Sequence, residues 1–291
     1  MTRLYQRKAR IIVGPRLFEF PGLRLSFVVK RSFRPELNTA EATVYNLNDS
    51  SRGAVMNADR PSFCIEAGHV SNFISLFVGR AIHIETTRGD TIGTATKFMA
   101  FDGDQVKNRM SKSFSPGAKV TDLIVEAAKA MKVNAGKAIA RAKNGDFDGA
   151  VNGFLNGMVM FGEAGDELTK LGKAAGFTWT IQDAELIILK SGEALESSLI
   201  LAPKTGLIGS PERVNDKFQK KLFLVRGKSI LNGRIQPGRR IEIDSVEIKG
   251  SFRVESVTHS GDTDGPEWQS EFEAVQIQPQ ASRPVLESGV A

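Results

Sequence analysis

Apolar and polar residues alternate along the last third of this sequence. The apolar positions form a series of short runs at Ile241, Ile243, Val246, Ile248, Phe252, Val254, Val257, Trp268 and Phe272. A two-residue period that is interrupted by Gly, Pro and Asp is typical of antiparallel strands that bury one face. Residues 201–278 are therefore predicted to form a small β-barrel or sandwich that presents surfaces.

The first 110 residues show the same alternation. Two early strands are predicted, broken at Gly14–Pro15 and followed by a turn at Pro21–Gly22. Asn48, Asp49, Ser50 and Ser51 offer N-cap residues for a short helix that is expected to run through Met56. Further strands are expected at residues 62–68, 72–86 and 96–110. Residues 1–110 are thus predicted to form a first β domain.

Residues 111–200 follow a different pattern. Apolar side chains recur at helical spacing between Val120 and Met131. A second helix is predicted over residues 165–175, and Gly176 is a suitable residue to end it. The hairpin that follows is expected to bend at residues 182–184. Two helices and a hairpin indicate a small α+β insert.

Two segments lack clear periodicity. Residues 132–160 are rich in Gly, Ala and Asn, and we expect an extended or mobile connection there. Residues 279–291 are expected to be a flexible, unpacked tail. The predicted fold is therefore mainly β, with two β-barrel or sandwich domains flanking a small helix-containing domain.

Composition is that of an ordinary globular protein, with 41% hydrophobic and 25% charged residues in 291. Apolar runs fall short of the ~20 residues that span a bilayer, and the N-terminal one is too short for a signal peptide. We expect neither Sec export nor membrane insertion. The single cysteine, Cys64, excludes an intrachain disulfide and a cysteine zinc site. It is expected to be buried and inert.

The formal net charge of +6 is too small for a dedicated nucleic-acid binder. Part of it lies at Arg234, Arg239 and Arg240, around a Pro-Gly turn. These side chains are either solvated or contact acidic surfaces of partner proteins, and they are the partner-contact candidates. Direct DNA binding has little support, because the sequence shows neither a recognition helix nor aromatic residues interleaved with the basic ones.

Metal and cofactor chemistry has little support. His69, His83 and His259 are far apart in sequence, which favours structural or surface roles. Three acidic residues near Gly265 loosely resemble a calcium loop and are the only metal candidates: Asp262, Asp264 and Glu267. Too few oxygen ligands and the absence of flanking helices favour a hairpin turn instead. No metal or cofactor is expected.

Catalysis is not expected either. Glu163, Asp166 and Glu167 could be the paired carboxylates of a glycoside hydrolase. They lie at the start of a predicted helix, where acidic side chains complement the helix dipole. Nucleophile-elbow, zinc-protease and phosphate-loop motifs are missing from the sequence. The chain is therefore predicted not to be an enzyme, with no catalytic residues.

Five segments, in order, resemble the baseplate hub proteins of contractile-tailed, Mu-like bacteriophages. They are ATVYNLNDSSRGAV, SPGAKVTDLIVEAAK, GFTWTIQDAELIIL, TGLIGSPERV and the run from ILNGRIQPGRR to EWQSEFEA. The resemblance covers most of the chain. It implies two domains related to the tail-tube fold around the insert. It departs at residues 215–226, a basic stretch where a clean strand is expected.

The resemblance also implies an assembly. In such hubs three copies form a ring that joins the sixfold tail tube to the threefold central spike, and the lumen is part of the DNA channel. The implied partners are further copies of this chain as a homotrimer, the tail tube or tube-initiator protein, the central spike and other baseplate proteins. Genomic DNA would pass through without specific binding. The implied location is the tail baseplate of the virion, assembled in the bacterial host cytoplasm.

If the copies form a ring, physical chemistry predicts how their strand edges pair and what charge the channel lining carries. Neighbouring copies are expected to pair β edges that would otherwise be exposed. Phosphate contacts add up along a duplex, so the lining should not be strongly basic and the Arg-rich turns should face partners or solvent. Two alternatives stay open: a β-rich carbohydrate-binding or tail-tip module, for which two Trp and two Tyr are few, and the hub of a tailocin or other contractile injection system.

Overall fold

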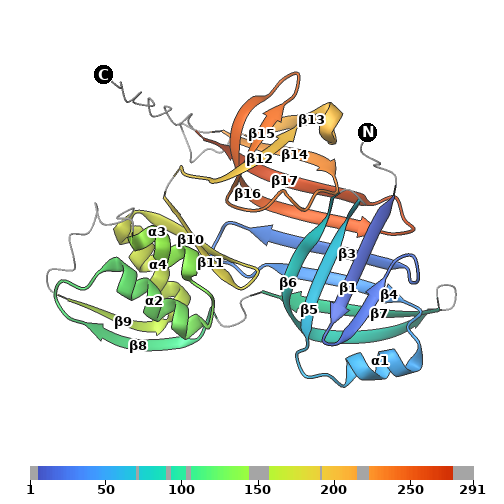
Figure 1. The fold of residues 1–291 in the computed structure, drawn as a ribbon, viewed down its shortest axis with the longest axis horizontal. Helices are drawn as coiled ribbons and strands as arrows, with labels where there is room; N and C mark the ends of the chain where they lie inside the picture. The colour runs from blue at the N-terminus through green and yellow to red at the C-terminus, as the bar shows by residue number, and fades with distance from the viewer. Residues whose placement is uncertain are drawn as a thin grey trace, which may run out of the picture.

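The computed structural model describes residues 6–69, 72–89, 93–102, 106–143, 157–190, 192–214 and 223–277. Within them the chain is mainly β, as predicted, and is built around one 13-stranded sheet. Figure 1 shows the helix-containing middle of the chain as a lobe of its own beside two β-rich parts. The N-terminal part lies beneath the C-terminal part in this view, and the sheet runs from one to the other.

The N-terminal β block holds seven strands and one helix: β1 (Arg7–Val13), β2 (Arg16–Glu19), β3 (Leu25–Ser32), β4 (Thr39–Tyr45), α1 (Asp49–Met56), β5 (Ser62–His69), β6 (Asn72–Gly89) and β7 (Gly93–Phe101). They are hydrogen-bonded in the order β3-β4-β7-β6-β5-β1-β2. The alternation predicted from the sequence places Leu25, Phe27 and Val29 of β3 in the core. The Asn48 side chain accepts a hydrogen bond from the N–H of Ser51 and caps α1, as predicted.

The C-terminal β block contains β12 (Leu195–Leu201), the 3-10 turn η1 (Pro203–Thr205), β13 (Leu207–Val214), β14 (Leu224–Ile230), β15 (Arg239–Asp244), β16 (Lys249–Asp262) and β17 (Trp268–Gln276). Its core is a separate apolar cluster that includes Ile241, Ile243 and Phe252. β12 pairs with β15 in parallel, and the other described pairings of the block are antiparallel.

β16 joins the two blocks into one sheet. Its first half pairs with β15, and residues 256–262 pair with β3 of the N-terminal block. Trp268 at the start of β17 belongs to the N-terminal core and meets Phe27 edge-on, with ring centroids 5.7 Å apart. At Gly261 a Cβ atom would lie 2.4 Å from the Phe27 ring, so only glycine allows this close approach. The two blocks therefore share backbone hydrogen bonds and apolar packing.

The insert contains β8 (Arg109–Phe114), α2 (Val120–Met131), α3 (Gly136–Lys143), β9 (Met158–Glu163), α4 (Ala164–Ala175), β10 (Phe177–Gln182) and β11 (Glu185–Lys190). The helices pack on each other and on two small hairpin sheets, β8-β9 and β10-β11, around a third apolar cluster. α2 and α4 confirm the predicted helices, and Gly176 ends α4 in a left-handed conformation, with φ 75°. The β10-β11 bend at Asp183 and Ala184 has positive φ at both residues, as a type I′ turn requires.

Three expectations are wrong. The first concerns residues 132–160, where residues 136–143 form a helix and residues 158–163 a strand; residues 144–156 lie outside the described part of the chain. α3 escapes the sequence pattern because it is short, and among its residues 136–141 Ala138 alone is fully buried. Asn134 Oδ1 accepts the N–H of Gly136 at its start, 2.9 Å away.

The second error is Val246. The alternation places it among the buried positions of a strand, but it is 95% exposed in the turn between β15 and β16, because Ser245 and Ile248 form hydrogen bonds with each other across that turn.

The third wrong expectation concerns Cys64, which is half-buried. β5 turns Phe63 and Ile65 inward, so the side chain between them lies on the outward face. Partial burial raises the pKa of the Cys64 thiol, which lowers its reactivity.

The predicted domain limits at residues 110 and 200 stay predictions. β8 and β12 straddle these positions: β8 pairs inside the insert, and β12 pairs with β15 of the C-terminal block. β14 (Leu224–Ile230) begins inside the ambiguous basic stretch and takes up its residues 224–226, while residues 215–222 and the tail 279–291 lie outside the described residues. In the described parts, helices long and apolar enough to cross a bilayer are absent.

Candidate functional site

The insert and the β blocks meet at a buried polar contact around Arg31. Arg31 occupies an inward position of β3, and its side chain is 2% exposed. Its guanidinium donates to Gln182 Oε1 (2.9 Å), to the carbonyl of Leu76 (3.0 Å) and to Asp183 Oδ2 (2.8 Å). The first and last of these acceptors are the tip of the β10-β11 hairpin. One buried cation thus binds the insert to the N-terminal block.

Asn38 makes a second connection beside it. Its side-chain amide donates to the carbonyl of Ile181 (2.9 Å) and to Asp102 Oδ2 (2.7 Å), and its backbone N–H donates to Asp102 Oδ1 (2.9 Å). Burial raises the pKa of Asp102 to about 6, although the hydrogen bonds from Asn38 and the charge of Arg31 oppose the shift. We call Arg31, Asn38, Asp102, Gln182 and Asp183 the hairpin clamp. Its hydrogen bonds fix the position of the insert.

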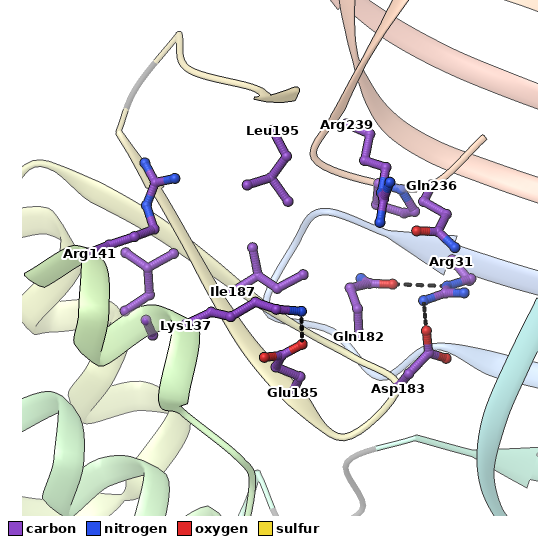
Figure 2. Close-up of a pocket in the computed structure, with 13 residues that line it drawn as sticks. Arg31, Lys137, Arg141, Gln182, Asp183, Glu185, Ile187, Leu195, Gln236 and Arg239 are labelled. Carbon is purple, nitrogen blue, oxygen red and sulfur yellow. Dashed lines mark hydrogen bonds and ion pairs between the residues drawn. The ribbon is translucent and has the colours of Figure 1, made fainter. Parts of the chain in front are cut away.

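A pocket of about 260 Å³ lies next to the clamp. Residues from five separate parts of the chain line it: Arg31 of β3, the β10-β11 hairpin, α3, the segment around Leu195 and residues 236–239. Figure 2 shows Arg31, Gln236 and Arg239 on one side and Ile187, Leu195 and Arg141 on the other. The pocket is therefore where the insert and both β blocks come together.

Most charges around the pocket are paired. Lys137 Nζ lies 2.6 Å from Glu185 Oε2, Arg141 contacts Glu193, and Arg31 is bound by Asp183. For the Arg239 guanidinium, the described residues provide no carboxylate within ion-pair distance. A shallower hollow of about 580 Å³ continues past Arg239 to Arg234, Glu196 and Ile74.

The three predicted partner-contact residues have different surroundings. Arg240 is engaged within the chain, since its guanidinium lies 2.7 Å from Glu242 Oε1 and 3.0 Å from Ser251 Oγ. Arg234 and Arg239 are exposed and line the same hollow. The structure thus brings Arg234 and Arg239 together but ties Arg240 to its own strand and the next. Their role in partner contact stays a prediction.

The predicted metal candidates lie in a hairpin tip between β16 and β17, as the turn interpretation expects. Asp262 pairs with Arg24 (2.7 Å) and accepts the N–H groups of Asp264 and Gly265 through Oδ1. These bonds and the Arg24 charge lower the pKa of Asp262, outweighing its partial burial, which acts to raise it. Among the described residues, no group of His, Cys, Asp and Glu side chains has the arrangement of a metal site.

The other candidate residues have structural surroundings. His69 is buried beside Trp268, with ring centroids 6.4 Å apart, and His83 is exposed near Glu85. His259 is fully buried with Nδ1 2.7 Å from Ser270 Oγ, and this burial lowers the pKa of His259 to about 3. Glu163, Asp166 and Glu167 lie at the N-terminus of α4, as predicted, and Glu167 pairs with Lys170 (2.5 Å).

The outward face of the central strands forms a second candidate surface. Cross-strand neighbours Ser260, Val28, Glu41 and Met99 run across it from β16 to β7. Three of its cations are paired with carboxylates. Arg226 lies 2.6 Å from Glu273, Lys228 lies 2.7 Å from Glu271 and Lys97 lies 3.7 Å from Glu85. Mixed charge and hydroxyl groups make this face polar without a dominant sign.

Sequence reasoning missed the hairpin clamp. One signal was available: Arg31 continues the inward alternation of Leu25, Phe27 and Val29, so the pattern places a charge at a buried position. Buried charges need partners, which points to a polar contact. The partners Asn38, Asp102 and Gln182 come from loops and a strand end, where the sequence pattern carries no such information.

Solved structures of tail proteins share this fold. A tail protein from Neisseria meningitidis has a TM-score of 0.62 and 11% identity, covering 94% of this chain and 97% of that one. The 43 kDa tail protein of prophage MuSo2 from Shewanella oneidensis has a TM-score of 0.62 and 9% identity, covering 93% and 97%.

A third structure is an Escherichia coli component of the type VI secretion system, described as similar to the T4 bacteriophage tail proteins gp27 and gp5. Its TM-score is 0.55 at 11% identity, covering 92% of this chain and 77% of that one. No protein-family model and no curated protein matches the sequence. The likenesses confirm the predicted fold: the chain has the fold of phage tail proteins.

Proposed function

We propose that this chain is a structural subunit of a phage tail baseplate, and that three copies form its hub ring. One observation carries the proposal: a single chain supplies two β blocks that β3 and β16 join into one continuous sheet. Three such chains contain six β blocks, which suits a connection between a sixfold tube and a threefold spike. The shared fold of the tail proteins supports this assignment.

Contacts between copies are expected to involve more than edge pairing. On its main path the described sheet ends at β2 and β13, and a branch through β15 ends at β12. β2 has only four residues, and β13 contains Pro211 and a register shift, features that restrict pairing with a further strand. We therefore propose that side chains near these edges and in the loops contribute to the interface between copies.

The outward face of the central strands is our candidate for the channel lining. Three of its cations are paired with carboxylates, and Lys30, which lacks a carboxylate partner among the described residues, shares the face with Glu41, so a DNA duplex would meet little net positive charge. Unpaired cations along a channel would accumulate phosphate contacts and slow the passage of DNA. Balanced charge is consistent with DNA that passes without specific binding.

The proposed partners are the tail tube or tube-initiator protein, the central spike and other baseplate proteins, in a virion tail assembled in the host cytoplasm. We propose no catalytic step. The likeness to a type VI secretion component favours one variant, in which the same ring is the hub of a tailocin or other contractile injection system. The neighbouring genes would separate the two settings, since a tailocin lacks genes for a capsid.

Mass determination tests the ring. Purified chain is examined by light scattering and native mass spectrometry over a range of concentrations, alone and with the spike protein encoded beside it. We expect trimers, and ring-shaped particles in negative-stain images. A chain that stays monomeric at the highest concentration, with and without the spike, would refute the proposal.

A further inference from the structure

The pocket beside the hairpin clamp has a polar and an apolar wall. Arg31, Gln236 and Arg239 form the polar wall, and Figure 2 shows their side chains gathered on one side. Ile187 and Leu195 supply the apolar groups on the other side, where the Lys137–Glu185 ion pair and Arg141 also lie. A volume of about 260 Å³ holds a small organic group. A ligand with one polar end and one apolar end would match both walls.

Arg31 has hydrogen-bonding capacity to spare. A guanidinium carries five N–H groups, and three of them have described acceptors in Gln182, Leu76 and Asp183. Described residues offer no acceptor to the remaining two. Because the side chain is 2% exposed, bulk water reaches these groups poorly, and unsatisfied buried donors are unfavourable. An oxygen acceptor in the pocket would satisfy them.

The charge count leaves room for one further anion. Four cations surround the pocket: Arg31, Lys137, Arg141 and Arg239. Three carboxylates pair with the first three, namely Asp183, Glu185 and Glu193. Within the described residues Arg239 lacks such a partner. The pocket therefore carries about one uncompensated positive charge, which a single carboxylate would neutralise.

We propose that this pocket binds a carboxylate carried on a short apolar group. Arg31 and Arg239 would donate to the carboxylate oxygens, the Gln236 amide would complete the polar wall, and Ile187 and Leu195 would contact the apolar part. Bidentate pairing suits arginine and carboxylate geometry. The carboxylate comes either from a free small molecule or from an acidic residue of a partner chain; the second source rests on the proposed function.

Calorimetry with benzoate tests the site on the full chain. Benzamide, its neutral analogue, is the ligand control. We expect benzoate to bind with one site per chain and benzamide about tenfold more weakly, because a hydrogen bond to a charged group is lost. Arg239→Gln should weaken benzoate binding about tenfold. Arg240→Gln removes the same charge one residue away, where the side chain is held by Glu242, and should change binding less than about twofold.

Equal weakening by the two substitutions, equal binding of benzoate and benzamide, or no binding of benzoate would each overturn the proposal. These results do not depend on ring formation, so the site and the proposed function can fail separately. Where rings form, their comparison with the dissociated chain identifies the source of the carboxylate. Benzoate binding that is lost on assembly indicates a partner's acidic residue, and binding that is retained indicates a small molecule.

Discussion

The β3-β16 seam and the hairpin clamp join parts of the same molecule in different ways. At the seam, seven residues of β16 pair with β3 along the backbone, and Trp268 and Phe27 pack beneath them. At the clamp, the insert is held to the N-terminal block mainly by the side chains of Arg31 and Asn38. The seam is thus a feature of the backbone, whereas the clamp depends on a few residues.

This difference predicts different mechanical roles. A ladder of backbone hydrogen bonds over a shared core opens only with the unfolding of both blocks. A clamp of a few polar side chains can open while each part stays folded. We expect the two β blocks to move as one body and the insert to be the part that can change its position.

Removing the aromatic ring at the seam should have the largest effect. Trp268→Ala leaves a cavity against Phe27 and should lower the free energy of unfolding by about 3–5 kcal/mol, measured by urea denaturation followed by circular dichroism. Val246→Ala, at a site that is 95% exposed, is the control and should change stability by less than about 0.5 kcal/mol. A loss below about 1 kcal/mol for Trp268→Ala would mean that the seam does not need this packing.

Acid should weaken the seam through His259. The folded-state pKa of His259 is about 3, below its ordinary value of 6.5, so the unfolded chain takes up a proton first as the pH falls. The contribution of His259 to the free energy of unfolding is fully present above pH 6.5 and is lost as the pH falls toward 3. About 3 kcal/mol is lost at pH 4. His259→Gln should remove this slope. An unchanged pH dependence in the variant would contradict the burial of a neutral imidazole.

Asp102 at the clamp should act in the opposite direction. Its folded-state pKa of about 6 lies above the ordinary 3.8, so the folded chain holds the proton more tightly. Its contribution is greatest below pH 4 and is lost as the pH rises through 6, by about 2 kcal/mol between pH 4 and pH 7. Asp102→Asn does not titrate and should lack this loss. If the free energies of unfolding of the variant and the natural chain change with pH in parallel, the raised pKa of Asp102 is refuted.

Loss of the clamp cation should have a smaller effect on stability but a clear effect on position. Arg31→Met should cost about 1–3 kcal/mol, because the Asp183 carboxylate left behind is partly solvated. Hydrogen exchange in β10 and β11 should rise, while exchange in β3 and β16 stays slow. Arg240→Met, which breaks only partly exposed pairs, is the matched control. Equal acceleration in β16 would show that the clamp and the seam are not independent.

The sequence was sufficient for regular elements and insufficient for irregular ones. Strict alternation in β3 and in β15 to β17, and helical spacing in α2 and α4, identified these elements because each buries one face. Val246 broke the same rule, since a turn interrupts the period without a Gly or Pro at that residue. α3 was missed because eight residues give too few repeats to recognise a period.

The clamp and the pocket could not be predicted from the sequence for another reason. Their members lie far apart in sequence: Arg31 and Gln182 are separated by 151 residues, and Arg7 of β1 reaches the tip of the β16-β17 hairpin. Such contacts follow from how the blocks pack, which periodicity within one element does not describe. Arg239 was recognised as a candidate, but its position beside Arg31 required the fold.

The pairing of β16 with β3 also sets the order in which the protein can fold. The apolar core of the N-terminal block includes Leu231 and Trp268, so this block remains incomplete until residue 268 has been synthesised. Contacts over such sequence separations form slowly, because a long loop must close before they become favourable. During synthesis the insert, whose core is local, should fold first and the two β blocks last, together. The β edges that a neighbouring copy could contact are then formed only after residue 268 has been synthesised.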